Sequence, residues 1–326
     1  MGIRNQTGTG KHGSAEPPIR VRVLVLNFDP RVSTEGNKPL HVALGWNNPR
    51  HLAQEYIRDV RDASCGLVRY IIVEWRDIDG FPVKTDGFVY SVEQFLRCWR
   101  EQKGWHEPDS ADYERVLKEQ GVDKFINANK IDEVWLFGAP YMGFWESAMA
   151  GPGAFYINGG VYDRFPTRRP FAIMGFSYER GVAEMLHNLC HRTESTMARI
   201  YGGWEADKLT THWARFAANA HQSGGYAGVG SCHYPPNAEK DYDYANPRTV
   251  LSTAEDWLNY PNLTGKKTPV NCESWGGPDY HRNYMRWWFR HLPRAPGIHP
   301  QDGRLNNWWR YVFEFTCYDE RGRPLK

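Results

Sequence analysis

The stretch from Ser177 to Gly203 most constrains the fold of this chain, because its residue pattern predicts one long helix. Ser177 is a suitable N-cap, Glu179 places a negative charge in the first turn, and the Gly202-Gly203 pair is a typical helix stop. At about 100° per residue, one face gathers the residues suited to a core, namely Val182, Met185, Leu186, Leu189, Thr193, Met197 and Ile200. Within an arc of about 80°, the other face carries Glu184, His187, His191 and Glu194.

Two histidines four residues apart on one helical face can bind a single divalent metal ion. His187 and His191 have this spacing, and their segment resembles the His-Glu-x-x-His helix of the zincin metallopeptidases, with Asn188 at the position of the glutamate. The resemblance implies a zinc cofactor and hydrolysis of peptide-like bonds. In zincins that glutamate is the general base, and an amide cannot accept the proton. Glu184 and Glu194 are therefore the predicted substitutes, and a non-catalytic zincin-like protein is the alternative.

A third metal ligand is expected from outside this helix, because neither Glu184 nor Glu194 can join both histidines on one ion without strain. His233 is the predicted ligand, since Pro235-Pro236 stiffens its loop and reduces the entropy lost on binding. The alternative for His233 is a loop histidine hydrogen-bonded to the backbone. The alternative for the helix is an ordinary amphipathic helix whose polar face is solvated or forms Glu-His and Glu-Arg pairs.

Strand and helix patterns alternate before the histidine helix. Apolar, β-branched runs predict strands, and capped amphipathic patterns predict helices. The strands are expected at 21–28, 67–75, 131–137 and 171–174, and the helices at 49–66, about 91–102 and about 110–121. The long segment 138–170 is expected to hold an edge strand at 154–157 and to help form a cleft. This order predicts an α/β or α+β fold, with a mixed sheet, packed helices and a parallel first strand pair.

Three regions are expected along the chain. Residues 1–18 form a disordered polar lead-in, residues 19–203 an α/β domain that ends in the histidine helix, and residues 204–326 an irregular, aromatic-rich part packed on the first as one unit. This order resembles the layout of zincin catalytic domains. The chain also resembles a bacterial protein family with a Glu-x-x-His helix, a His-Tyr-Pro-Pro-Asn segment, here 233–237, and a Trp-rich end. That family brings no assigned activity.

Charge and composition narrow the expected partners. The chain has 40 Lys and Arg residues against 38 Asp and Glu, so bulk electrostatics do not favour binding to nucleic acid or to an anionic membrane. No apolar run reaches the length of a membrane span, and residues 1–18 lack the apolar core of a signal peptide. The expected partner is a peptide or glycan substrate. The expected location is the cytoplasm as the chain stands, or outside the cell if a signal has been removed.

Two other functional classes fit parts of the sequence. Ser177 lies on a strand-to-helix turn, as a serine nucleophile would, but Glu179 is larger than a nucleophile elbow allows. A glycan-active or glycan-binding protein would use the rings of Trp287-Trp288 and Trp308-Trp309, with its acid and base among Glu74, Asp77 and Glu146. Adjacent tryptophans point in different directions, so at least one ring of each pair is expected in the core.

Overall fold

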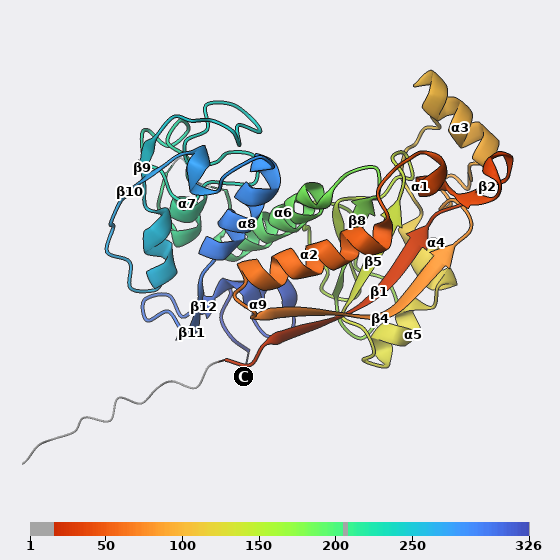
Figure 1. The fold of residues 1–326 in the computed structure, drawn as a ribbon. Helices are drawn as coiled ribbons and strands as arrows, with labels where there is room; N and C mark the ends of the chain where they lie inside the picture. Colours follow the sequence, from red (N-terminus) through yellow and green to blue (C-terminus); the bar gives the residue numbers. More distant parts are fainter. Residues whose placement is uncertain (1–15, 205–207, 326) are drawn as a thin grey trace, which may run out of the picture.

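A six-stranded mixed sheet lies at the centre of the computed structural model, which describes residues 16–204 and 208–325 (Figure 1). The strand order is β4-β1-β5-β8-β6-β7; β4, β1, β5 and β8 are parallel, and β6 runs antiparallel to β8. The strands are β1 (Ile19–Phe28), β4 (Val68–Ile78), β5 (Glu133–Gly138), β6 (Ser147–Ala150), β7 (Val161–Tyr162) and β8 (Phe171–Ser177). The predicted mixed sheet with packed helices and its parallel first strand pair are confirmed. Residues 1–15 of the predicted lead-in lie outside the described residues.

Helix α6 (Val182–Tyr201) lies among the other helices and against the sheet. It contacts β6, β8, α2 (Pro49–Ala63), α7 (His212–Ala217), α8 (Tyr280–His291) and α9 (Trp308–Phe313). Figure 1 shows α6 running from the sheet into the C-terminal part of the molecule. The other helices are α1 (Leu40–Ala43), α3 (Val92–Glu101), α4 (Tyr113–Glu119) and α5 (Val122–Asn127). Short elements complete the described chain, namely β2 (Arg31–Val32), η1 (Ser33–Glu35), β3 (Lys38–Pro39), β9 (Val250–Ser252), η2 (Ala254–Asn259), β10 (Thr268–Val270), η3 (Cys272–Ser274), β11 (Arg294–Ile298) and β12 (Leu305–Asn307).

The central strands are buried on both faces, as expected for parallel strands covered by helices. Every residue of β5 is buried, and in β8 only Ser177 is partly exposed. Gly175 of β8 permits a close backbone approach, because a Cβ at this position would lie 2.1 Å from the backbone oxygen of Trp145. The Gly175 N–H donates to the backbone oxygen of Glu146 at 3.1 Å. The segment before β6 is therefore held against β8.

Two predictions of local structure are wrong. Ser177 does not cap the histidine helix; it ends β8, where it pairs with Gly138, and the helix begins at Val182 after the N-cap Gly181. Pairing within the sheet outweighs the local capping preference. The edge strand is not at 154–157 either; the sheet ends in β7 at Val161–Tyr162, which pairs with β6.

The polar face of α6 is covered by the C-terminal part of the chain. His187 and Glu194 have exposed fractions of 5% and 3%. The His281 ring of α8 contacts His187, and the backbone N–H of Cys232 donates to Glu194. A solvated polar face is therefore wrong, whereas the other alternative, a Glu-His pair, is present between Glu194 and His191 at 3.1 Å.

The Trp-rich C-terminal part contributes to the core. Trp288, Trp308 and Trp309 are fully buried, and Trp287 is 8% exposed. These rings pack on neighbouring aromatic side chains; Trp308, for example, lies 5.7 Å from Trp257 between ring centres. They are not available to stack on a sugar.

A buried ion pair fixes α6 against the sheet. Arg192 Nη1 lies 2.7 Å from Glu133 Oε2 of β5, and each side chain is 1% exposed. Arg192 Nη2 also donates to the Val312 backbone oxygen of α9 at 2.7 Å. The other Glu133 oxygen accepts from Trp135 Nε1 at 2.8 Å. Loss of one partner would leave the other charge buried and uncompensated.

Glu133→Gln is expected to lower the free energy of unfolding by about 3–5 kcal/mol, because the Arg192 guanidinium stays buried without its counter-charge. Urea denaturation followed by circular dichroism measures the change. Glu119→Gln is the control, since it breaks only the exposed pair with Arg115 on α4 and should leave stability unchanged within error. A Glu133→Gln effect as small as that of the control would contradict the role of the pair.

Candidate metal centre

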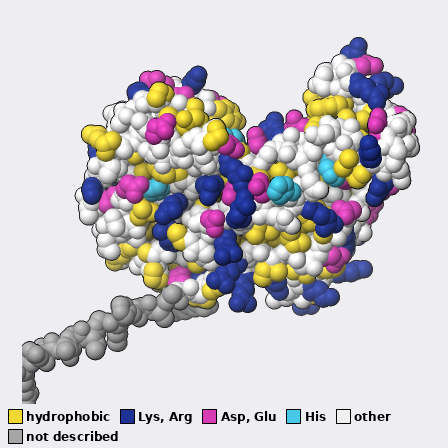
Figure 2. Space-filling model, viewed as in Figure 1, with side chains coloured by type: hydrophobic (Ala, Val, Ile, Leu, Met, Phe, Trp, Pro, Cys, Tyr) yellow, Lys and Arg dark blue, Asp and Glu magenta, His cyan; other side chains and the backbone are white. Residues whose placement is uncertain are grey.

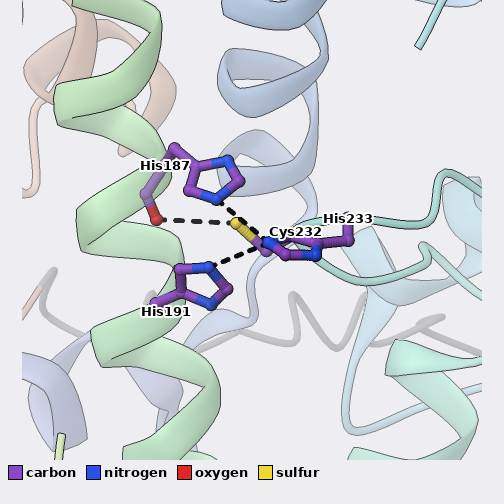
Figure 3. Close-up of side chains that lie close together, drawn as sticks. All are labelled: His187, His191, Cys232 and His233. Atoms are coloured by element: carbon purple, nitrogen blue, oxygen red, sulfur yellow. Dashed lines mark hydrogen bonds between the residues drawn. The ribbon is translucent and has the colours of Figure 1, made fainter. Parts of the chain in front are cut away.

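Three imidazole side chains converge beside α6 (Figure 3). His187 and His191 lie one turn apart on the helix, and His233 comes from the loop that follows α7. The Nε2 atom of His233 is 3.2 Å from that of His187 and 3.1 Å from that of His191. Cys232 completes the group, and the ligand atoms of all four residues lie within 4.8 Å of one another. The three predicted ligands are thus brought together, and the group could hold a metal ion.

The outward-facing nitrogen of each imidazole has a partner. His191 Nδ1 lies 3.1 Å from Glu194 Oε2, and His233 Nδ1 lies 2.9 Å from Asp241 Oδ1. His187 Nδ1 lies 3.2 Å from Nε2 of His281. Because a carboxylate only accepts, the Nδ1 atoms of His191 and His233 carry the proton. Partners of this kind orient metal-binding histidines and fix their tautomer.

This arrangement directs imidazole lone pairs toward one point. Lone pairs on Nε2 atoms 3.1–3.2 Å apart repel unless a proton or a metal ion lies between them. A tetrahedral ion with bonds of about 2.0–2.1 Å would separate its nitrogen ligands by about 3.3 Å. The observed spacing therefore fits a shared metal ion.

The two helix histidines differ in their tendency to bind a proton. Burial and the neighbouring imidazoles of His191, His281 and His233 lower the pKa of His187 to about 2. His187 is consequently neutral and able to bind a metal. Burial also opposes protonation of His191, but hydrogen bonds with Cys232 and Glu194 outweigh it and raise the pKa of His191. A proton and a metal ion therefore compete for this side of the cluster, and acid favours the proton.

Glu194, one of the two predicted bases, joins both parts of the centre. Its Oε2 faces His191, and its Oε1 accepts from the Cys232 backbone N–H at 2.7 Å. Both oxygens of this buried side chain are thus engaged in positioning ligands. Glu184, the other predicted base, accepts from the Gly181 backbone N–H at 3.2 Å in the first turn of α6.

A cleft with a volume of about 420 Å³ begins next to the centre. Its lining includes Tyr141, Trp145, Glu146, Ser177, Glu184 and Asn188. It lies at the carboxyl ends of β5 and β8, where ligands of open α/β sheets commonly bind. Figure 2 shows a hollow between the C-terminal part and the part that carries α3, above the N-terminal end of α6 in this view.

Glu146 connects the cleft with the histidine cluster. Its Oε2 lies 3.9 Å from His191 Nε2, the nitrogen that faces the other imidazoles. The side chain is 45% exposed, and the same oxygen accepts from Asn158 Nδ2 at 2.5 Å. Sequence reasoning considered Glu146 only as a glycosidase carboxylate. No spacing could reveal its approach to His191, because the two residues meet only through the β6-β8 pairing.

Tyr242 lies on the open side of the cluster. Its hydroxyl is 3.2 Å from His233 Nε2, and its ring is nearly parallel to that of His187. The residue has a φ of 56°, an uncommon conformation for a tyrosine that is often found at functional sites. Sequence reasoning missed Tyr242, Cys232 and His281 as site residues. For Tyr242 and Cys232, the only indication in the sequence was the polar character of segment 232–246.

The other candidate residues lie apart from this centre. Glu74 and Asp77 belong to β4, four strand positions from β6, which corresponds to about 19 Å. Neither can form a glycosidase pair with Glu146 across that distance. Ser177 Oγ accepts from the Glu179 backbone N–H, and no histidine of the described residues hydrogen-bonds to it.

No protein-family model matches this chain, and no curated protein sequence matches it significantly. Within residues 16–204 and 208–325, no helix is long and apolar enough to cross a lipid bilayer. The function is therefore inferred from the geometry of the site.

His187→Ala, His191→Ala and His233→Ala are each expected to remove the bound metal, because each deletes one of three converging nitrogens. Elemental mass spectrometry should find about one metal ion per chain in the purified native protein. It should find far less metal in the three variants. His51→Ala is the control, since this α2 side chain is 74% exposed. A full equivalent of metal in all three variants would contradict the assignment of these histidines as metal ligands.

Glu194→Gln is expected to weaken metal binding by about 10–100-fold, because it removes the charge that orients His191. Asp241→Asn should have a smaller effect, since Asp241 is 49% exposed and solvent already screens its charge. Competition with a chelator of known affinity measures both constants. Unchanged affinity in Glu194→Gln would show that this carboxylate does not position the ligand.

Proposed function

We propose that this protein is a zinc-dependent hydrolase that acts on peptide-like bonds. The observation that carries the proposal is the convergence of three imidazole nitrogens, each with an outward partner, beside a cleft that contains carboxylates. Three histidines with the fourth position open are typical of catalytic zinc sites. In this proposal Cys232 is not a ligand, and its thiol keeps its contact with the His187 backbone oxygen at 3.5 Å. Imidazole ligands also favour zinc over magnesium or calcium. The zincin-like helix supports hydrolysis of peptide-like bonds.

In this proposal the ion supplies Lewis-acid activation of water and of the scissile carbonyl. His187, His191 and His233 hold it, and the partners of their Nδ1 atoms keep the rings in place. Glu146 accepts the proton from water, because its carboxylate approaches the metal-facing side of the cluster from the cleft. Tyr242, whose hydroxyl lies 3.2 Å from His233 Nε2, would donate a hydrogen bond to the oxygen that becomes negative.

Glu184 is the second possible base. It lines the same cleft one turn before His187, but one of its oxygens accepts the Gly181 N–H and caps α6. Glu146 Oε2, by contrast, already lies 3.9 Å from the metal-facing nitrogen of His191. This argument favours Glu146 over Glu184.

A glycan-directed hydrolase is the second candidate function. Tyr141 and Trp145 line the cleft with exposed fractions of 37% and 45%. Tyr141 is also stacked on Trp105 at 3.7 Å between ring centres, which presents a fixed aromatic surface. Such a surface suits a sugar ring as well as an apolar peptide side chain.

Glu146→Gln is expected to reduce hydrolysis of an unspecific peptide substrate by about 10²–10⁴-fold while the metal content stays at the native level. The amide keeps the shape of the side chain and loses the proton acceptor. Glu101→Gln, on the exposed surface of α3, is the matched control.

The same assay on Glu184→Gln separates the two bases. If Glu184→Gln loses most of its activity and Glu146→Gln remains active, Glu184 is the general base. Native activity in both variants would refute a carboxylate base from this cleft. A parallel panel of oligosaccharides distinguishes the peptide from the glycan substrate.

A further inference from the structure

A second cavity lies in the C-terminal part of the molecule. It has a volume of about 550 Å³, and its lining comes from α7, η2, segment 261–267 and residues 299–301. None of its lining residues belongs to the cleft or to the histidine cluster. A ligand in this cavity therefore does not touch the metal centre.

Basic side chains dominate the ionisable groups of this cavity. They are His212, Arg215, Lys267 and His299, and Asp256 is the one carboxylate among the lining residues that the structure describes. Asp256 is buried, and its oxygens accept from Thr264 N, Thr264 Oγ1 and Gly265 N at 2.9, 2.9 and 2.7 Å. This carboxylate holds the turn at 264–265. It is thus engaged elsewhere, and the cavity keeps an excess of positive charge.

Arg215 lacks an acceptor in the described structure. Its Nε atom is buried and has no hydrogen-bond partner, and no described carboxylate forms an ion pair with its guanidinium. A buried polar group without a partner is unfavourable, and among the described buried atoms of this kind Arg215 Nε is the one that belongs to a residue of this cavity. An oxyanion in the cavity would supply the missing acceptor, and the planar guanidinium suits carboxylate and phosphate groups.

The surroundings of Arg215 favour an anion on a larger body. Burial, with smaller contributions from Arg215 and His299, lowers the pKa of His212 to about 4 against the opposing effect of Asp302, so this ring is neutral and can also donate a hydrogen bond to an anion. Lys267 lies at the exposed rim, with its Nζ 5.8 Å from the centre of the Tyr226 ring. Trp257 and Leu263 form an apolar part of the cavity wall. The volume lies within the range of small-molecule sites and exceeds the needs of a bare oxyanion.

We propose that this cavity is a binding site for a small organic anion, whose phosphate or carboxylate group is held by Arg215 and Lys267. The remaining volume takes the rest of the ligand, which packs on Leu263 and the Tyr226 ring. The site is independent of the metal centre and of the reaction proposed there. The protein would thus bind a negatively charged small molecule in addition to the metal ion.

Calorimetric titration of the full-length protein with inorganic phosphate, and separately with acetate, tests the proposal at constant ionic strength set with chloride. Saturable binding of at least one anion is expected, and the tighter one identifies the chemistry of the head group. Arg215→Gln should weaken that binding by about 10–100-fold, the loss expected for a hydrogen bond to a charged group. Lys267→Gln, at an exposed position that does not affect folding, should weaken it in the same direction.

Lys118→Gln is the control, because it removes an exposed charge on α4, outside the cavity. It should bind the anion as the native protein does. Metal content should be native in all three variants, so failure of this site and failure of the metal centre are distinguishable. Absence of saturable binding of both anions, or equal binding by the native protein and Lys267→Gln, would overturn the proposal.

Discussion

The buried pair between Arg192 and Glu133 sets the rotation of α6, and the candidate centre depends on that rotation. Arg192 directs its charge at β5, where Glu133 is also held by Trp135. Its neighbour His191 projects about 100° away around the helix axis, toward the 232–233 segment. A helix free to roll by a fraction of a turn would separate His191 from His233. The cost of leaving either buried charge unpaired makes such a roll unfavourable.

The second constraint is the burial of the polar face of α6 under the C-terminal part. Burial of several imidazoles and a carboxylate is costly unless each finds a partner. Glu194 meets this condition on both sides, because one oxygen faces His191 and the other accepts from the backbone of Cys232. The carboxylate therefore stabilises the interface and fixes the distance between His191 and His233. The contacts that assemble the centre therefore also pack the C-terminal part onto α6.

Some of this arrangement could be predicted from the sequence, and some could not. The buried strands, the long helix and the pair His187 and His191 follow from periodicity, which is local information. His233 was expected because prolines stiffen its loop. Ser177 was misassigned because sheet pairing with Gly138 outweighs local capping. The approach of Glu146 to His191 was not predictable either, since it depends on which segment pairs with β8 and on the missing Cβ of Gly175.

In the hydrolase that we propose, Asn188 explains why the general base comes from across the cleft. In the zincin-like reading its position belongs to a glutamate, yet here Asn188 Nδ2 donates to the Gly175 backbone oxygen at 2.7 Å. A carboxylate cannot donate, so a glutamate at this position would face a carbonyl oxygen that has lost its partner. The amide ties α6 to β8 at the place where Gly175 lets the backbone of Glu146 approach. The same contact that removes a base from the helix thus positions another carboxylate on the opposite wall, 3.9 Å from the metal-facing nitrogen of His191.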